Sequence, residues 1–224
     1  MTVTDTDPIP SLSEIQTACE AHVQQLWAAQ GGLDGAHDLG HLRRVWANCQ
    51  RIARVEGGAD MAVLLAAAML HDAVNLPKDA PNRAQASRLS AQAAAEFLPG
   101  LGFGPGRIAA VAHAIEAHSF SAGIPPQTPE ARILQDADRL EALGAIGIAR
   151  MFHVAGAMGA ALFDAADPLA LHRPLDDRAF ALDHIAVKLV PVAESMQTAE
   201  GRERAAEALE WMESFRSRLL REIG

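Results

Sequence analysis

The ten residues from Met61 to Leu70, MAVLLAAAML, constrain the fold more than any other segment, because none of them is polar. A helix that is apolar on every side must be surrounded by other elements, so this segment predicts a helix at the centre of the fold. Asp60 is placed to cap its N-terminus. The run is far shorter than the roughly 20 apolar residues of a membrane span, so no membrane partner is expected.

The rest of the chain shows helical periodicity and no alternating strand pattern, which predicts an all-α fold. SLSE, from Ser11, is typical of a capping box, and Asp38 is a second predicted N-cap. Glycines between residues 144 and 159 predict close packing or a break, and Pro191 should kink or end its helix. Further helices are predicted at about 11–31, 38–57, 84–98, 105–118, 129–142, 143–164, 177–196 and 198–221.

Length and charge bound the organisation and the partners. Residues 1–10 contain two prolines and no apolar period and are predicted to be a flexible arm, whereas 11–224 suit a single domain. The net charge of -9, without a clustered basic face, argues against long nucleic acid as a partner. The acidic, polar N-terminus does not resemble a secretory signal, so a cytoplasmic location is expected. The oligomeric state is left open, with a homodimer as one option.

His71 and Asp72 directly follow the central apolar helix. A buried carboxylate is unfavourable unless a partner compensates its charge, and a metal ion would do so; alternatively, the dipeptide caps the helix end in solvent. Two further ligand-type residues favour the metal. His41 lies beside the apolar stripe of its helix, and Asp138 lies among the apolar residues of ILQDADRLEALG. Two imidazoles and two carboxylates suit a divalent ion and leave positions for water and substrate.

The order of these residues resembles the metal signature of the HD-domain superfamily of phosphohydrolases. Five segments are similar to a branch of small, single-domain bacterial members: HDLGHLRRVW, AAMLHDAV, AIEAHSFS, ILQDADRLEALGAIGIAR and HRPLDDR. The resemblance implies a bundle of roughly eight to ten helices holding one divalent metal ion (Mn, Mg, Co, Ni, Fe or Zn) through His41, His71, Asp72 and Asp138. It also implies hydrolysis of phosphate esters or anhydrides, most often in nucleotides.

Two residues are candidates for the chemistry itself. Asp72 could orient the attacking water as well as bind the ion. His118 ends the predicted helix 105–118 and could donate to a phosphate oxygen or protonate the leaving group; a structural histidine is the alternative. The predicted activity is therefore hydrolysis of a small phosphorylated metabolite, a nucleotide, by metal-activated water.

Four residues are candidates for substrate binding. Lys78 and Arg83 follow the His-Asp pair in a predicted loop, which suits a polyphosphate, although ordinary surface charge is the alternative. His184 and Lys188 share one helix face, and the resemblance makes Lys188 a candidate phosphate contact. The alternative for Lys188 is a solvated side chain.

Three other functions are weighed. Relatives that cleave cyclic dinucleotides carry Gly and Lys soon after the His-Asp pair, where this chain has AVN. A di-iron oxygenase of the same superfamily would need a second ion, held through His113 or His118. A non-catalytic module that senses a nucleotide would not need a complete set of metal ligands.

Overall fold

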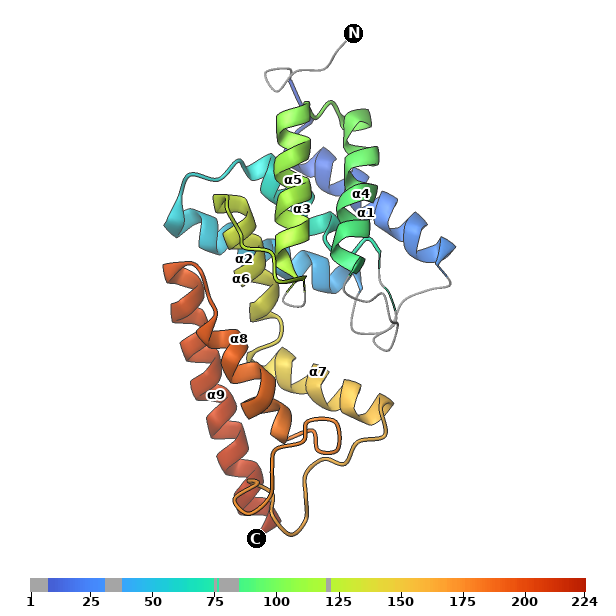
Figure 1. Cartoon of the computed structure of the whole chain (residues 1–224). Coiled ribbons are helices and arrows are strands. Elements are labelled where there is room, and N and C mark those ends of the chain that lie inside the picture. Colours follow the sequence, from blue (N-terminus) through green and yellow to red (C-terminus); the bar gives the residue numbers. More distant parts are fainter. Residues whose placement is uncertain (1–7, 31–37, 75, 77–84, 120–121) are drawn as a thin grey trace. The chain divides into compact units, whose positions relative to one another are not determined.

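The computed structural model describes residues 8–30, 38–74, 76, 85–119 and 122–224. Within these residues the chain forms nine α-helices, and its β-structure is one isolated bridge between Ala161 and Phe180 (Figure 1). The protein is all-α, as the sequence predicts. The chain divides into two compact units, Met1–Asp138 and Arg139–Gly224. The single domain over 11–224 stays a prediction, and residues 1–7 of the predicted arm lie outside the described residues.

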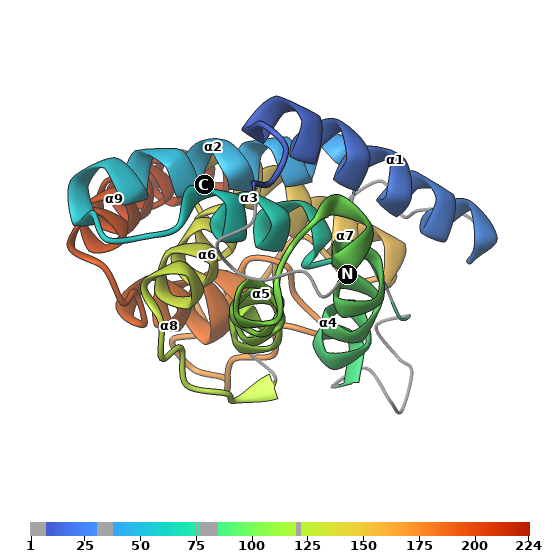
Figure 2. The same cartoon turned by 90° about the horizontal axis from the view of Figure 1, so that it is seen from above.

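The first unit is built around one apolar helix. Its helices are α1 (Leu12–Ala29), α2 (Leu39–Glu56), α3 (Met61–Leu70), α4 (Ala86–Phe97), α5 (Pro105–His118) and most of α6 (Pro129–Leu140), with a short 3-10 helix, η2 (Leu98–Leu101), after α4. α3 packs against α1, α2, α4 and α5, and Figure 2 shows it enclosed by these helices. Every residue from Ala62 to Leu70 is buried. The predicted central helix is confirmed.

Predicted caps begin three of these helices. At α1, Ser11 forms a capping box with Glu14, whose carboxylate accepts the Ser11 N–H at 2.9 Å. Asp60 accepts N–H groups from the first turn of α3. At α2, Asp38 accepts the N–H of His41 at 2.8 Å. The residue that starts α2 therefore also fixes the backbone of a candidate metal ligand.

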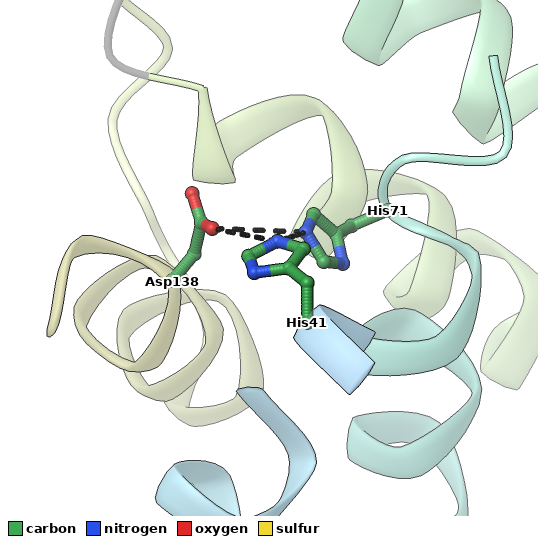
Figure 3. A group of neighbouring side chains, drawn as sticks. All are labelled: His41, His71 and Asp138. Atoms are coloured by element: carbon green, nitrogen blue, oxygen red, sulfur yellow. Dashed lines mark hydrogen bonds and ion pairs between the residues drawn. The ribbon is translucent and has the colours of Figure 1, made fainter. Parts of the chain in front are cut away.

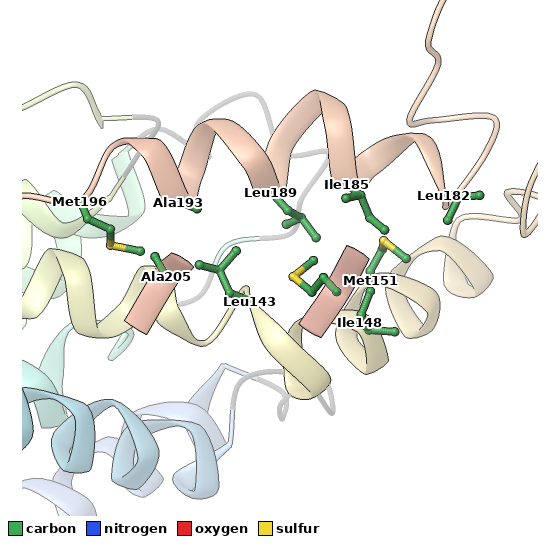
Figure 4. Packing of buried hydrophobic residues seen from close by; sticks show 10 residues of the cluster. Leu143, Ile148, Met151, Leu182, Ile185, Leu189, Ala193, Met196 and Ala205 are labelled. Atoms are coloured by element: carbon green, nitrogen blue, oxygen red, sulfur yellow. The ribbon is translucent and has the colours of Figure 1, made fainter. Parts of the chain in front are cut away.

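The second unit has its own hydrophobic core. It contains α7 (Gly144–Ala157), a π-helix, η4 (Ile185–Leu189), the short α8 (Val190–Glu194) and α9 (Ala199–Ile223), which packs against α7 and α8. The buried apolar side chains form one cluster (Figure 4) of Leu143, Ile148, Met151, Leu182, Ile185, Leu189, Ala193, Met196, Ala205 and Met212. The cluster is mainly aliphatic, as expected for a chain with few aromatic residues.

Two helix predictions in this unit are wrong in extent. α7 ends at Ala157 instead of near 164, because the chain then pairs with a later segment: the Ala161 N–H donates to the Ala179 carbonyl, and its carbonyl accepts from Ala181, both at 2.9 Å. The same pairing holds residues 179–182 out of the helix predicted at 177–196, in which helical backbone begins at 183, just before η4. Pro191 is the second residue of α8, which follows η4 without a break. Because proline has no N–H, it cannot donate a helical hydrogen bond here, where the backbone changes from π-helix to α-helix.

Arg173 organises the irregular segment between α7 and η4. Its guanidinium donates to both carboxylate oxygens of Asp183 and lies 4.3 Å from the centre of the Phe180 ring. Asp183 is buried and also accepts the Asp176 N–H at 2.8 Å. A paired charge and a cation–π contact therefore tie this segment together.

The break between α6 and α7 follows from two glycines. Gly144 has a φ of 65°, in the left-handed region that favours glycine, and a Cβ on Gly147 would lie 2.1 Å from the Ala142 carbonyl oxygen. The predicted break in this glycine-rich stretch is confirmed. Among the described residues no single helix is long and apolar enough to cross a membrane, although the bent pair α6 and α7 passes on length and composition.

Candidate metal centre

Two buried histidines from different helices form the base of the centre. His41 lies in the first turn of α2, and His71 directly follows the last residue of α3. The His71 ring is oriented by its Nδ1, which donates to the Ala68 carbonyl at 2.9 Å. Because Nδ1 carries the proton in this arrangement, Nε2 of His71 presents a lone pair, as a metal ligand must.

The two carboxylates converge on the same pair of imidazole nitrogens. The Nε2 atoms of His41 and His71 are 3.3 Å apart. Asp138 Oδ1 lies 3.4 Å from His41 Nε2 and 3.7 Å from His71 Nε2 (Figure 3). Asp72 Oδ2 lies 3.7 Å and 3.5 Å from the same two nitrogens. Four residues from three separate stretches of the chain thus present their ligand atoms to one point.

These separations suit a single cation. Ligand atoms about 2.1 Å from one ion lie between roughly 3.0 and 4.2 Å apart in tetrahedral or octahedral geometry. The distances from His41 and His71 to each other and to both carboxylates all fall inside that range. His41, His71 and Asp138 form a group of ligand atoms within 4.8 Å of one another, which could hold a metal ion.

The protonation states also favour a cation. Burial would raise the pKa of Asp138, but its hydrogen bond with His41 and the other imidazoles hold that pKa well below its usual range. In Asp72, burial is likewise outweighed, mainly by His71 and His118, so the pKa is lowered. The pKa of His71 is lowered, chiefly because its ring is fully buried. Anionic carboxylates beside a neutral imidazole are the forms that bind a divalent ion.

Comparison with known proteins identifies the family. The HD domain model matches residues 38–143, which contain all four converging residues. YpgQ of Bacillus subtilis is 31% identical over 191 residues, 84% of each chain. This chain belongs to the HD-domain family. The structure of YpgQ in complex with ADP matches with a TM-score of 0.72 and 29% identity, covering 94% of this chain and 96% of that chain. An HD-superfamily hydrolase from Bacillus thuringiensis matches with a TM-score of 0.72 and 28% identity, covering 95% and 98%.

The HD-domain centre includes a third buried histidine. His118 ends α5, its Nδ1 donates to the Ile115 carbonyl, and its Nε2 lies 3.9 Å from Asp72 Oδ1. Its ring centre is 4.8 Å from that of His71. His71, Asp72 and His118 form a second group of ligand atoms within 4.8 Å of one another. The other histidine on α5, His113, accepts the N–H of Gln127 at 3.0 Å instead.

Several residues that hold the HD-domain centre in place escape sequence reasoning. The Trp27 indole N–H donates to the Asp72 carbonyl at 3.0 Å, and the Gln135 amide donates to the Ala117 carbonyl at 2.7 Å. Asn48 donates to the Ala137 carbonyl at 3.4 Å. Each bond joins residues far apart in the chain and fixes the backbone next to a site residue. Local sequence patterns do not predict such long-range hydrogen bonds.

Of the four predicted substrate-binding residues, the structure describes two, His184 and Lys188. Lys78 and Arg83 lie outside the described residues. His184 and Lys188 belong to the second unit, where His184 Nδ1 lies 2.8 Å from an Asp177 carboxylate oxygen and Lys188 is on the π-helix η4. Partial burial, together with the charge of Arg139, lowers the pKa of Lys188. Substrate binding by these four residues stays a prediction.

Proposed function

We propose that this HD-domain protein is a metal-dependent phosphohydrolase that cleaves a small phosphorylated metabolite, a nucleotide, at the centre formed by His41, His71, Asp72 and Asp138. The observation that carries the proposal is the meeting of two imidazole nitrogens and two carboxylates within 3.3–3.7 Å of their neighbours. These donor atoms suit Mn, Mg, Co, Ni, Fe or Zn. The fold, which is that of HD-superfamily hydrolases, supports the same chemistry.

Some residues of the centre are proposed to bind the ion, and others to orient the attacking water. A divalent ion bound here would act as a Lewis acid on a phosphoryl oxygen and make an attacking water more acidic. His41, His71 and Asp138 direct one ligand atom each to the ion position. Asp72 turns Oδ2 towards both imidazoles, which leaves Oδ1 to orient a water. His118 faces this second oxygen and completes the proposed catalytic pair with Asp72.

The choice of a nucleotide rests on a relative and on charge. YpgQ has been solved in complex with ADP. A nucleoside phosphate needs cations beyond the metal, and Lys78, Arg83, His184 and Lys188 are the proposed groups. Cleavage at the terminal phosphate and release of pyrophosphate both agree with this proposal. A screen with resolved products therefore has to separate them.

One ion is favoured over the two that an oxygenase needs. The two ligand groups share His71. Because its Nδ1 is bonded to the Ala68 carbonyl, His71 has only Nε2 to offer and cannot serve two ions. Counting metal atoms per chain tests this point: two irons would favour the oxygenase.

The function is tested by offering nucleoside mono-, di- and triphosphates to the purified protein with Mn, Mg, Co, Ni or Zn, and separating the products by chromatography. At least one pairing is expected to release phosphate or pyrophosphate, and chelation or His71→Ala to abolish release. Absence of both products from every pairing would contradict the proposal. Nucleotide binding without turnover in the metal-loaded wild type would favour the sensor.

A further inference from the structure

The tautomer of His118 limits what this residue can do. Its Nδ1 lies against the Ile115 carbonyl oxygen, which can only accept a hydrogen bond, so Nδ1 carries the proton. In the neutral ring Nε2 then has a lone pair and no hydrogen. Nε2 is therefore an acceptor, and the sequence-based role of donating to a phosphate oxygen or leaving group does not suit this arrangement.

The partner that Nε2 faces is an acceptor as well. Asp72 Oδ1 lies 3.9 Å away, too far for a direct hydrogen bond, and it is the carboxylate oxygen turned away from the ion position. A donor between them would satisfy both atoms. A water oxygen about 2.8 Å from each acceptor would span 3.9 Å at an angle of about 90°, close to that between the two O–H bonds of water.

The access and the rigidity of the pair agree with this role. The Asp72 side chain is 23% exposed, so solvent reaches this carboxylate, whereas His118 is 7% exposed and is held on one side by protein. The Gln135 amide donates to the carbonyl of Ala117, the residue before His118, and Ile115 holds the ring. Such a fixed acceptor can hold a water in one orientation.

We propose that His118 Nε2 and Asp72 Oδ1 together accept both hydrogen bonds of the attacking water and aim its lone pair at phosphorus. This inference rests on the proposed function. It states that His118 contacts the attacking water, and not the phosphate or the metal ion. Oxygen–phosphorus bond formation uses the lone pair of that water, and the phosphorus–oxygen bond to the leaving group breaks. As the bond forms, one of the water's two protons passes to His118 Nε2, the other stays on the oxygen that has joined phosphorus, and the leaving group departs with the electron pair of the broken bond.

The test separates the water, the ion and the phosphate as targets of His118. In His118→Leu, kcat is expected to fall about 100-fold, within the usual range for a positioned acid–base group, with KM unchanged. The affinity for Mn²⁺, measured by calorimetry without substrate, is expected to stay at the wild-type value. His118→Gln places an acceptor near the former Nε2 position and is expected to restore part of kcat. His113→Leu removes an imidazole from the same helix and is the matched control, with kcat unchanged.

Three outcomes would overturn the proposal. A Mn²⁺ affinity at least tenfold weaker in His118→Leu would make His118 a ligand. A raised KM at constant kcat would make it a phosphate contact. Equal kcat in His118→Leu and wild type would make it a structural residue. If the wild type itself turns over no nucleotide, the proposed function fails and this inference with it, whereas an active wild type beside an equally active His118→Leu refutes the inference alone.

Discussion

Both units contain carboxylates that are largely shielded from solvent, but they compensate the charge in opposite ways. In the second unit Asp183 pairs with the Arg173 guanidinium and a backbone N–H, so its charge is neutralised by the protein itself. In the first unit Asp72 and Asp138 form ion pairs with imidazoles only, as far as the described residues extend. Burial of a carboxylate therefore does not by itself indicate a metal centre; carboxylates that are paired only with imidazoles, among the described residues, are consistent with one.

Removing the charge of a proposed metal ligand, Asp138, should have the largest effect. In Asp138→Asn the affinity for Mn²⁺ is expected to fall more than about 100-fold, beyond what loss of an outer partner usually causes. Without metal, the melting temperature should fall modestly, because the lowered pKa of Asp138 means that its charge favours the folded state. Calorimetry and thermal unfolding in EDTA measure the two effects. A metal-free variant that no longer folds would instead give Asp138 a structural role.

Breaking the Arg173–Asp183 ion pair should lower the free energy of unfolding whether or not metal is present. In Arg173→Met the Asp183 carboxylate, only 2% exposed, is left without its cation, and the free energy of unfolding should fall by about 3 kcal/mol. Urea unfolding with and without Mn²⁺ measures it. Arg218→Met, which breaks the exposed pair with Glu222, is the control and should change stability by less than about 1 kcal/mol. Similar losses in the two variants would contradict the distinction between buried and exposed pairs.

Acid should distinguish the two clusters in the metal-free protein. The pKa of His71 is lowered by burial, so the unfolded chain binds a proton near pH 6.5 while the folded chain does not. The contribution of His71 to the free energy of unfolding is therefore fully present above pH 6.5. It decreases as the pH falls below that value, by at most about 1.4 kcal/mol per pH unit. Asp183 behaves differently: burial raises its pKa, but pairing with Arg173 outweighs this and lowers it, so its contribution is lost only below about pH 4.

The measurement is urea unfolding between pH 7 and 5. His71→Gln should flatten the fall in stability over this range, and Asp183→Asn should leave the slope unchanged. An unchanged slope in His71→Gln would show that other groups cause the acid response.

The smallest effect is expected from loosening the backbone behind a proposed ligand, Asp72. Trp27→Phe removes the hydrogen bond to the Asp72 carbonyl and should weaken Mn²⁺ binding by about tenfold. Trp211→Phe changes a half-exposed tryptophan of α9 and should leave the affinity unchanged. Calorimetry of both variants decides; equal affinities would show that α3 holds Asp72 without help from α1.

The predictable parts of the fold are those that local pattern determines. The all-apolar run gives α3, the caps at Ser11, Asp38 and Asp60 give three helix starts, and Gly144 marks a break. The order of His41, His71–Asp72 and Asp138 resembles a family signature, and that resemblance predicts that the four side chains converge. The structure shows this convergence. Metal binding by these residues stays a prediction.

The parts that could not be predicted depend on contacts between distant segments. The sequence predicts that residues 177–184 are helical. However, the pairing of Ala161 with residues 179 and 181 and the Arg173–Asp183 bonds keep residues 177–182 out of the helix. The tautomer of His118 is likewise invisible in the sequence, because it depends on where the end of α5 places a carbonyl. Hydrogen bonds such as that from Trp27 to Asp72 join residues 45 positions apart.

The position of His71 and Asp72 at the end of α3 couples the stability of the hydrophobic core to the geometry of the proposed metal site, two properties that protein engineers usually treat separately. α3 touches four neighbouring helices, and its last turn leads directly to both residues. A cavity such as that of Leu65→Ala would let the helix shift and carry the imidazole and the carboxylate with it. Directed evolution for heat tolerance in this interior would therefore change ion affinity at the same time. Screening such libraries under chelating conditions would keep the two traits apart.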